Sequence, residues 1–150
     1  MNAAFYDSLL NGQHVMFWFT STGRESIIKA ILFRSTCESD TYEMLLGDLN
    51  PDGSIDVEMR SNNGDTEKVL SIAAKSIAFF LSDHLEAKVV IEASSVSRMR
   101  LYQIAIGREM EDLGKYLDVY GFDGESLEAF RSGKSYKKFI VSLRNCQFNY

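Results

Sequence analysis

The sequence contains little proline and little cysteine: one proline, Pro51, and two cysteines, Cys37 and Cys146, in 150 residues. With so little proline and no low-complexity tract, the composition excludes a long disordered linker and predicts one domain over residues 1–150. The two cysteines match no zinc-ligand spacing and are too few for a disulfide-stabilised secreted scaffold, so we expect free thiols. We therefore expect no metal site and no cofactor.

Long apolar runs are also absent. No stretch of about 18 apolar residues occurs, and the N-terminal residues lack a basic segment followed by an apolar one. These features predict a cytoplasmic protein with neither a secretory signal nor a membrane span. The net charge of −5 argues against indiscriminate nucleic-acid binding, although it does not exclude nucleic acid as a partner.

Charge is unevenly distributed along the chain. Residues 38–67 contain nine acidic residues and one basic residue, whereas residues 131–144 contain five basic residues and no acid. The simpler interpretation is two solvated faces. The functional interpretation is that the segment from Arg131 to Arg144 meets a phosphate or an acidic partner, and the sequence leaves its role open.

The first 60 residues show the patterns of β-strands. Residues 15–21, 26–34 and 42–49 are rich in β-branched, aromatic and other apolar residues, and residues 55–59 alternate apolar and acidic ones. Because the connections are short and the Asn50–Gly53 segment has strong turn chemistry, these strands should form an antiparallel meander. Strand alternation places Trp18 on the face opposite to Phe17 and Phe19, so we expect it to be partly exposed.

The pattern then changes to the period of a helix. A helix capped by Asn63 or Asp65 should continue to about Asp83, and a strand over residues 87–93 should lie parallel to a meander strand. A second helix, capped by Ser94 or Ser95, should end at Leu113 before Gly114. Beyond it we predict a strand over 117–122, a short helix over 126–130, and a strand or helix over 136–143. The fold class is therefore α+β (α/β-like), with a mixed sheet.

The two helix starts contain the polar residues that we select as a candidate binding site, because backbone N–H groups and the helix dipole favour an anion there. Arg98 and Arg100 lie in the first turns of the second helix, where the positive end of the helix dipole repels a cation. A nearby negative charge should offset this repulsion. That offset is either an internal network with an acid such as Glu92 or Asp65, or a bound anion. The anion would be held by Asn62, Asn63, Ser95 and Arg98. The candidate binding residues are Asn62, Asn63, Asp65, Lys68, Ser95, Arg98, Arg100 and Tyr102.

Other reactive residue types form no recognisable site. His14 and His84 belong to no recognisable serine–histidine or cysteine–histidine motif, which gives little support to histidine-based catalysis. One acidic cluster invites a metal interpretation, but its spacing matches no calcium loop. This cluster consists of Asp48, Asp52, Asp56 and Glu58.

The order of elements, a meander followed by helix, strand and helix, resembles the ribonuclease H-like fold over about residues 15–113. The segments that carry this resemblance are Phe19–Ser21, Ala30–Arg34, Ser61–Asn63 and Ala93–Ser95. Enzymes of that fold hold two metal ions with carboxylates at strand ends and on the first helix, so the resemblance implies carboxylates at the matching positions. Here Ser21 and Ser94 or Ser95 stand at the strand positions, so two-metal nuclease chemistry should be absent.

A second resemblance is closer. Gly47-Asp48, the S-N-N-G-D-x-x-K-V-L pattern at Ser61–Leu70 and the S-x-x-x-R-x-R-L-Y pattern at Ser94–Tyr102 are similar to those of an uncharacterised family of small bacterial proteins. The resemblance implies a bacterial cytoplasmic protein and no particular activity.

We expect a non-catalytic binding module for a phosphate-bearing ligand or a partner protein. The alternative is a small metal-independent nuclease or toxin-type enzyme of a toxin–antitoxin pair, using Arg98, Tyr102 and Lys68.

Overall fold

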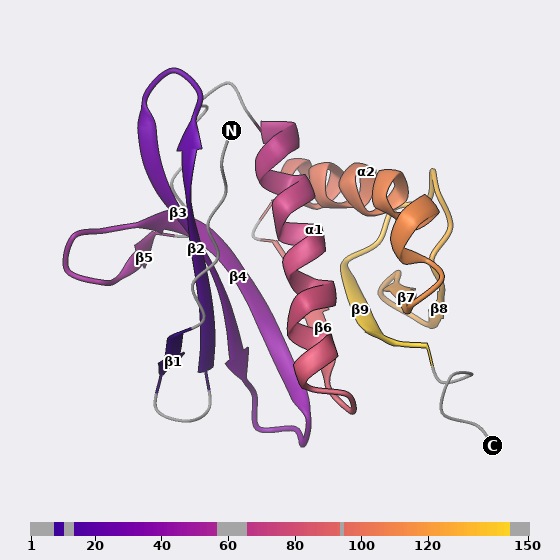
Figure 1. Ribbon diagram of the computed structural model, residues 1–150. Coiled ribbons are helices and arrows are strands. Elements are labelled where there is room, and N and C mark those ends of the chain that lie inside the picture. The colour runs from indigo at the N-terminus through magenta and orange to yellow at the C-terminus, as the bar shows by residue number, and fades with distance from the viewer. Residues whose placement is uncertain (1–7, 11–13, 57–65, 94, 145–150) are drawn as a thin grey trace.

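The computed structural model describes residues 8–10, 14–56, 66–93 and 95–144, which form nine strands and two helices (Figure 1). The strands β1 to β5 precede both helices, and the remaining strands follow α1. The elements are β1 (Ser8–Leu10), β2 (His14–Thr22), β3 (Ser26–Ser35), β4 (Thr41–Leu49), β5 (Ile55–Asp56), α1 (Thr66–Asp83), β6 (Lys88–Ile91), α2 (Val96–Leu113), β7 (Leu117–Phe122), β8 (Leu127–Ala129) and β9 (Lys138–Leu143).

The strands β2, β3 and β4 form the antiparallel meander that the sequence predicts. β5 pairs with the end of β4 through the predicted turn, in which the Gly53 N–H donates to the Asn50 carbonyl at 2.9 Å. Gly53 has a φ of 91°, a conformation that glycine adopts without strain. Of the strand predicted over 55–59, the last three residues lie outside the described part of the chain.

The second half of the chain extends the same sheet. β6 lies parallel to β4, as predicted for a strand that is reached through a helix, and β9 pairs antiparallel with both β6 and β7. The strand order is β1-β2-β3-β4-β6-β9-β7-β8, with β5 paired to β4 outside this path. The α+β class with a mixed sheet is therefore confirmed.

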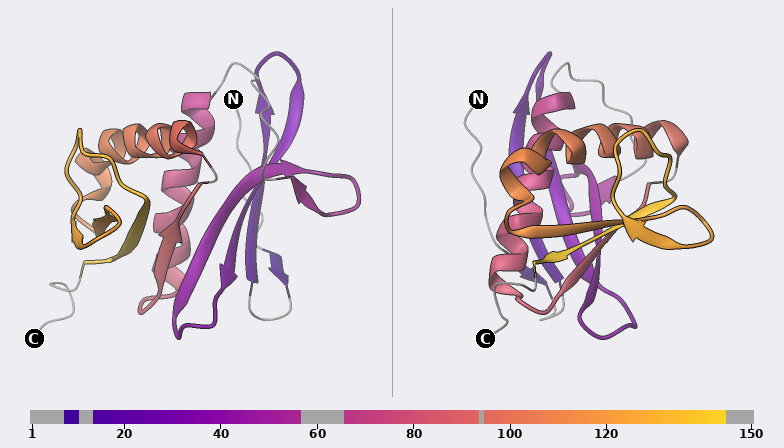
Figure 2. Two further views of the ribbon diagram at one scale, coloured as in Figure 1. Left: turned by 180° about the vertical axis from the view of Figure 1, so that it is seen from behind. Right: turned by 90° about the vertical axis from the view of Figure 1, so that its right-hand side faces the viewer.

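Both helices pack on one face of this twisted sheet, as the two views of Figure 2 show. The strand registers place Phe33, Met44, Ile91 and Phe139 in one row across that face, and all four are buried. From α1, Phe80 stacks on Phe33 with ring centroids 4.4 Å apart. Neither α1 nor α2 has the length and apolar character needed to cross a membrane.

The structure corrects or decides the predictions for the smaller elements β1, β8 and β9. The short helix predicted over 126–130 is wrong, because this segment contains β8, a strand paired with β7. The Asp123 carboxylate accepts the Glu125 and Ser126 N–H groups at 2.9 Å, and this side-chain turn directs the chain into a hairpin instead of a helix. β1, which precedes the first predicted strand, was not predicted, and the strand-or-helix segment 136–143 contains the strand β9.

Candidate functional site

Ser95 caps the start of α2. Its backbone is extended (φ −136°, ψ 153°), and its Oγ accepts the Arg98 N–H at 3.2 Å. This geometry satisfies one of the N–H groups that a helix start leaves without an intrahelical acceptor. Of the two serines that the sequence left open, Ser95 therefore makes the capping hydrogen bond.

The Ser95→Ala variant is expected to lose about 0.5–2 kcal/mol of unfolding free energy, since it removes this acceptor. Ser97→Ala is a matched control, because Ser97 is an exposed residue of the same turn. Urea unfolding of the two variants measures the difference. Equal stability of both variants would contradict the capping role.

The first turn of α2 has an unusual charge for its position. It contains no acidic residue but does contain Arg98, and Arg100 follows directly after it. Arg98 is half-buried and Arg100 is exposed, so the two guanidinium groups lie in different surroundings. Together with the positive end of the helix dipole, they create a positive potential at this end of α2.

Tyr102 lies one turn after Arg98 and is buried. Burial raises the pKa of its hydroxyl, and the nearby positive charge of Arg98 partly opposes this rise. The hydroxyl therefore remains protonated at neutral pH. It is suited to hydrogen bonding and poorly suited to act as a phenolate base.

The start of α1 is described only from Thr66 onward. The predicted site residues Asn62, Asn63 and Asp65, and the predicted caps of this helix, therefore lie outside the described residues. Lys68 is exposed in the first turn of α1.

Two side-chain contacts show where α1 meets α2. Arg108 Nη2 lies 3.5 Å from Glu67 Oε1, and the Ser71 hydroxyl donates to Glu109 Oε1 at 2.6 Å. Arg98 precedes Arg108 by ten residues, or about 15 Å along the axis of α2. The described site residues thus fall in two places: Ser95, Arg98, Arg100 and Tyr102 at the start of α2, and Lys68 beside its second half.

A buried polar cluster, Ser21, Lys29 and Asp48, lies on the sheet face that the helices cover. Lys29 is directly opposite Asp48 in the β3–β4 register and forms an ion pair with it. Lys29 is also opposite Phe19, two residues before Ser21 on β2. Sequence reasoning missed Lys29, although a lysine at an inward position of the apolar strand 26–35 was the signal.

Two members of the acidic cluster, Asp48 and Asp52, have structural roles. Asp48 pairs with Lys29, and the Asp52 carboxylate accepts the Ser54 N–H at 2.9 Å and its hydroxyl at 2.6 Å. The hydroxyl hydrogen bond is the main cause of a lowered Asp52 pKa. Within the described ranges, no three His, Cys, Asp or Glu side chains come together as a metal site.

The basic segment is not a free positive tail. Lys134 Nζ lies 2.6 Å from Glu128 Oε1 and 3.2 Å from Asp123 Oδ2, and Arg131 Nε lies 3.1 Å from Glu128 Oε2. Arg144 pairs with Asp118 and donates to the Gly114 carbonyl. Hydrogen bonds to the Ser126 and Glu125 N–H groups, followed by Lys134, lower the pKa of Asp123 to about 2. Three of the five basic residues, Arg131, Lys134 and Arg144, are therefore paired with acids of the segment from β7 to β9.

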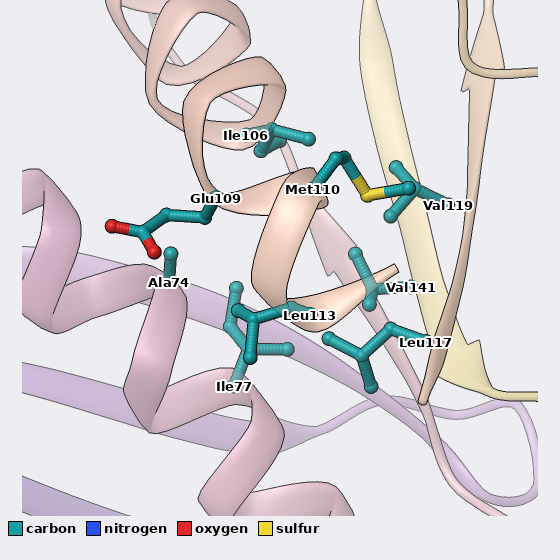
Figure 3. A pocket seen from close by; sticks show the side chains of 9 residues that line it. All are labelled: Ala74, Ile77, Ile106, Glu109, Met110, Leu113, Leu117, Val119 and Val141. Atoms are coloured by element: carbon teal, nitrogen blue, oxygen red, sulfur yellow. The ribbon is translucent and has the colours of Figure 1, made fainter. Parts of the chain in front are cut away.

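A small cavity lies between the helices and the sheet (Figure 3). Apart from Glu109 its lining is apolar, and its volume of about 20 Å³ would admit no more than a water molecule. It is a packing gap and not a ligand site. The lining residues come from α1 (Ala74, Ile77), α2 (Ile106, Glu109, Met110, Leu113), β7 (Leu117, Val119) and β9 (Val141).

Comparison with known proteins decides the relationship. A family model described as "Family of unknown function (DUF6934)" matches residues 2–144. The chain belongs to this family. No curated protein and no solved structure matches it.

Membership in DUF6934 confirms the expectation of an uncharacterised family. The matched residues include all the described strands and both helices. The ribonuclease H-like resemblance stays a prediction.

Proposed function

We propose that this protein is a non-catalytic binding module, and that the start of α2 binds a phosphate-bearing ligand. Ser95 and Arg98 would form the site, with Tyr102 buried one turn after Arg98 and neutral. Arg100, two residues after Arg98, points to another side of the helix. A bacterial cytoplasmic setting and a ribonuclease H-like relationship belong to the same proposal. They are supported by the resemblance of Ser61–Leu70 and Ser94–Tyr102 to small bacterial proteins, and by the order of elements.

One observation carries the proposal: Arg98 lies in the first turn of α2, Arg100 follows directly after that turn, and the turn contains no acid. Cations at a helix start are unfavourable by about 0.3–1 kcal/mol each at an exposed position. A bound phosphate would reverse this effect at Arg98, because its oxygens can accept hydrogen bonds from the guanidinium group and from backbone N–H groups of the helix start. The partial exposure of Arg98 leaves its side chain accessible from solvent.

The enzyme alternative has less support from the described residues. Lys68 lies in the first turn of α1, which faces the fourth turn of α2. Arg98 and Tyr102 lie in the first two turns of α2, away from Lys68. The raised pKa of Tyr102 also disfavours a phenolate nucleophile or base. A toxin–antitoxin role would be indicated by a small antitoxin-like reading frame beside the gene.

Arg98→Met tests the binding proposal. Inorganic phosphate or a nucleotide should raise the melting temperature of the parent protein by linkage, corresponding to about 2.7 kcal/mol at a hundredfold excess over the dissociation constant. The Arg98→Met variant should fold but gain no stability from the same ligand. Thermal melts in buffers of matched ionic strength measure both effects.

Arg24→Met is the matched control, because Arg24 is exposed in the turn between β2 and β3. It removes the same charge and should leave the ligand effect unchanged. A parent protein indifferent to phosphate and nucleotides, combined with a strongly destabilised Arg98→Met variant, would reject the site. That result would support the internal Arg–acid network instead.

A further inference from the structure

The charges along α2 oppose its dipole at both ends. Arg98 and Arg100 lie within the first five residues, near the positive end of the dipole, and Glu111 and Asp112 lie in the last turn, near its negative end. The last turn contains no basic residue. Both placements destabilise an isolated helix, so a partner that brings acids to the start and bases to the end would stabilise α2.

The outward face of α2 is also apolar at its centre. Ile104 is 52% exposed and Leu101 is 43% exposed, although the helix packs against α1 and the sheet on its other side. A Cβ atom added at Gly107, one turn after Ile104, would meet nothing within 4 Å. At the spacing of an α-helix, Arg100, Ile104, Gly107 and Glu111 follow one another along this face.

We propose that this face binds the same face of a second copy of the chain, with the two α2 helices antiparallel. A two-fold axis between Ala105 and Ile106 places Ile104 of each copy over Gly107 of the other, where a side chain is absent. The same axis places Arg100 of each copy beside Glu111 of the other. The interface is therefore self-complementary in shape and in charge, as a two-fold dimer requires.

The charges also select this register. A two-fold axis at Ile104 would place Arg100 against Arg108 of the other copy, and like charges in contact are costly. In the chosen register, the acidic end of each helix lies over the basic start of the other, which offsets both unfavourable dipole interactions. A single helix pair buries less than the roughly 800 Å² per partner of a standard interface, so the dimer should be reversible.

Charge reversal tests this arrangement. Arg100→Glu places glutamate against Glu111 twice in a homodimer, and Glu111→Arg places arginine against Arg100 twice. Each variant alone should associate at least about tenfold more weakly than the parent. An equimolar mixture of the two should associate as the parent does, because the mixed dimer contains two opposite-charge pairs. Sedimentation velocity across a concentration series measures all four samples.

Arg24→Glu, with the same charge change in the β2–β3 turn, is the control and should associate like the parent. Circular dichroism checks that each variant is folded, which we expect because both changes agree with the helix dipole. A parent that is monomeric at the highest concentration reached would overturn the proposal. So would variants that associate like the parent, or a mixture that stays as weak as its components.

Discussion

Replacing Phe80 with alanine is expected to reduce the free energy of unfolding by about 3–5 kcal/mol. Phe80 is 1% exposed and lies at the centre of the contact between α1 and the sheet. Its ring stacks on Phe33 at 4.4 Å and on His84 at 4.2 Å, and it meets Tyr42 edge-on at 4.9 Å. Truncation would leave a cavity that these rings cannot all close. Because domains of this size are stable by about 5–15 kcal/mol, the loss is a large fraction of the total.

The neighbouring residue provides the control. Phe79 is 54% exposed and contacts Phe17 edge-on at 5.6 Å. Phe79→Ala removes the same atoms from the same helix turn, and we expect it to cost no more than about 1–1.5 kcal/mol. Urea unfolding followed by the fluorescence of Trp18, the single tryptophan, measures both variants. Similar losses for the two variants would mean that Phe80 is not the packing centre.

Removing one partner of the Lys29–Asp48 pair is expected to cost about 3–5 kcal/mol, because the other charge stays buried without its ion-pair partner. Both residues are almost fully buried on the covered face of the sheet. Lys29→Met and Asp48→Leu should each be strongly destabilising. The double variant should lose much less than the sum, since it leaves neither charge behind.

The same two strands contain an exposed pair for comparison. Arg34 Nε donates to Glu43 Oε1 at 2.6 Å, and these two residues are also directly opposite each other in the β3–β4 register. Their side chains are 46% and 37% exposed, so solvent screens the pair, and Arg34→Met should cost at most about 1 kcal/mol. A double-variant cycle for each pair gives the coupling energies. Equal coupling energies for the buried and the exposed pair would contradict the expectation that burial strengthens the Lys29–Asp48 interaction.

Most of the strand and helix positions could be predicted because their patterns are local. The runs that became β2, β3 and β4 alternate or are continuously apolar, and short turns join them. Both helices have a 3.6-residue period with an apolar side. The parallel pairing of β6 with β4 was also predicted, since a helix connection allows it. Trp18, placed on the opposite face by alternation, is half-exposed as expected.

The wrong helix arose where a side chain competes with the local pattern. Residues 126–130 suggested a helix, but the Asp123 carboxylate bonds to the backbone just before them and starts a hairpin. The role of the basic segment was left open, because Glu128 and Asp123 come close to its charges only when β7 and β8 pair. Neither contact can be read from composition or spacing.

The sequence by itself determined the α+β class, the antiparallel start of the sheet, the capped start of α2 and the family to which the chain belongs. These properties depend on hydrogen bonds and apolar periodicity within short segments. Only the tertiary structure decided which polar residues meet. It joined Lys29 to Asp48 across two strands, and it placed the first turn of α1 against the fourth turn of α2. Such contacts depend on strand register and helix crossing, which arise when distant segments bury their apolar faces together.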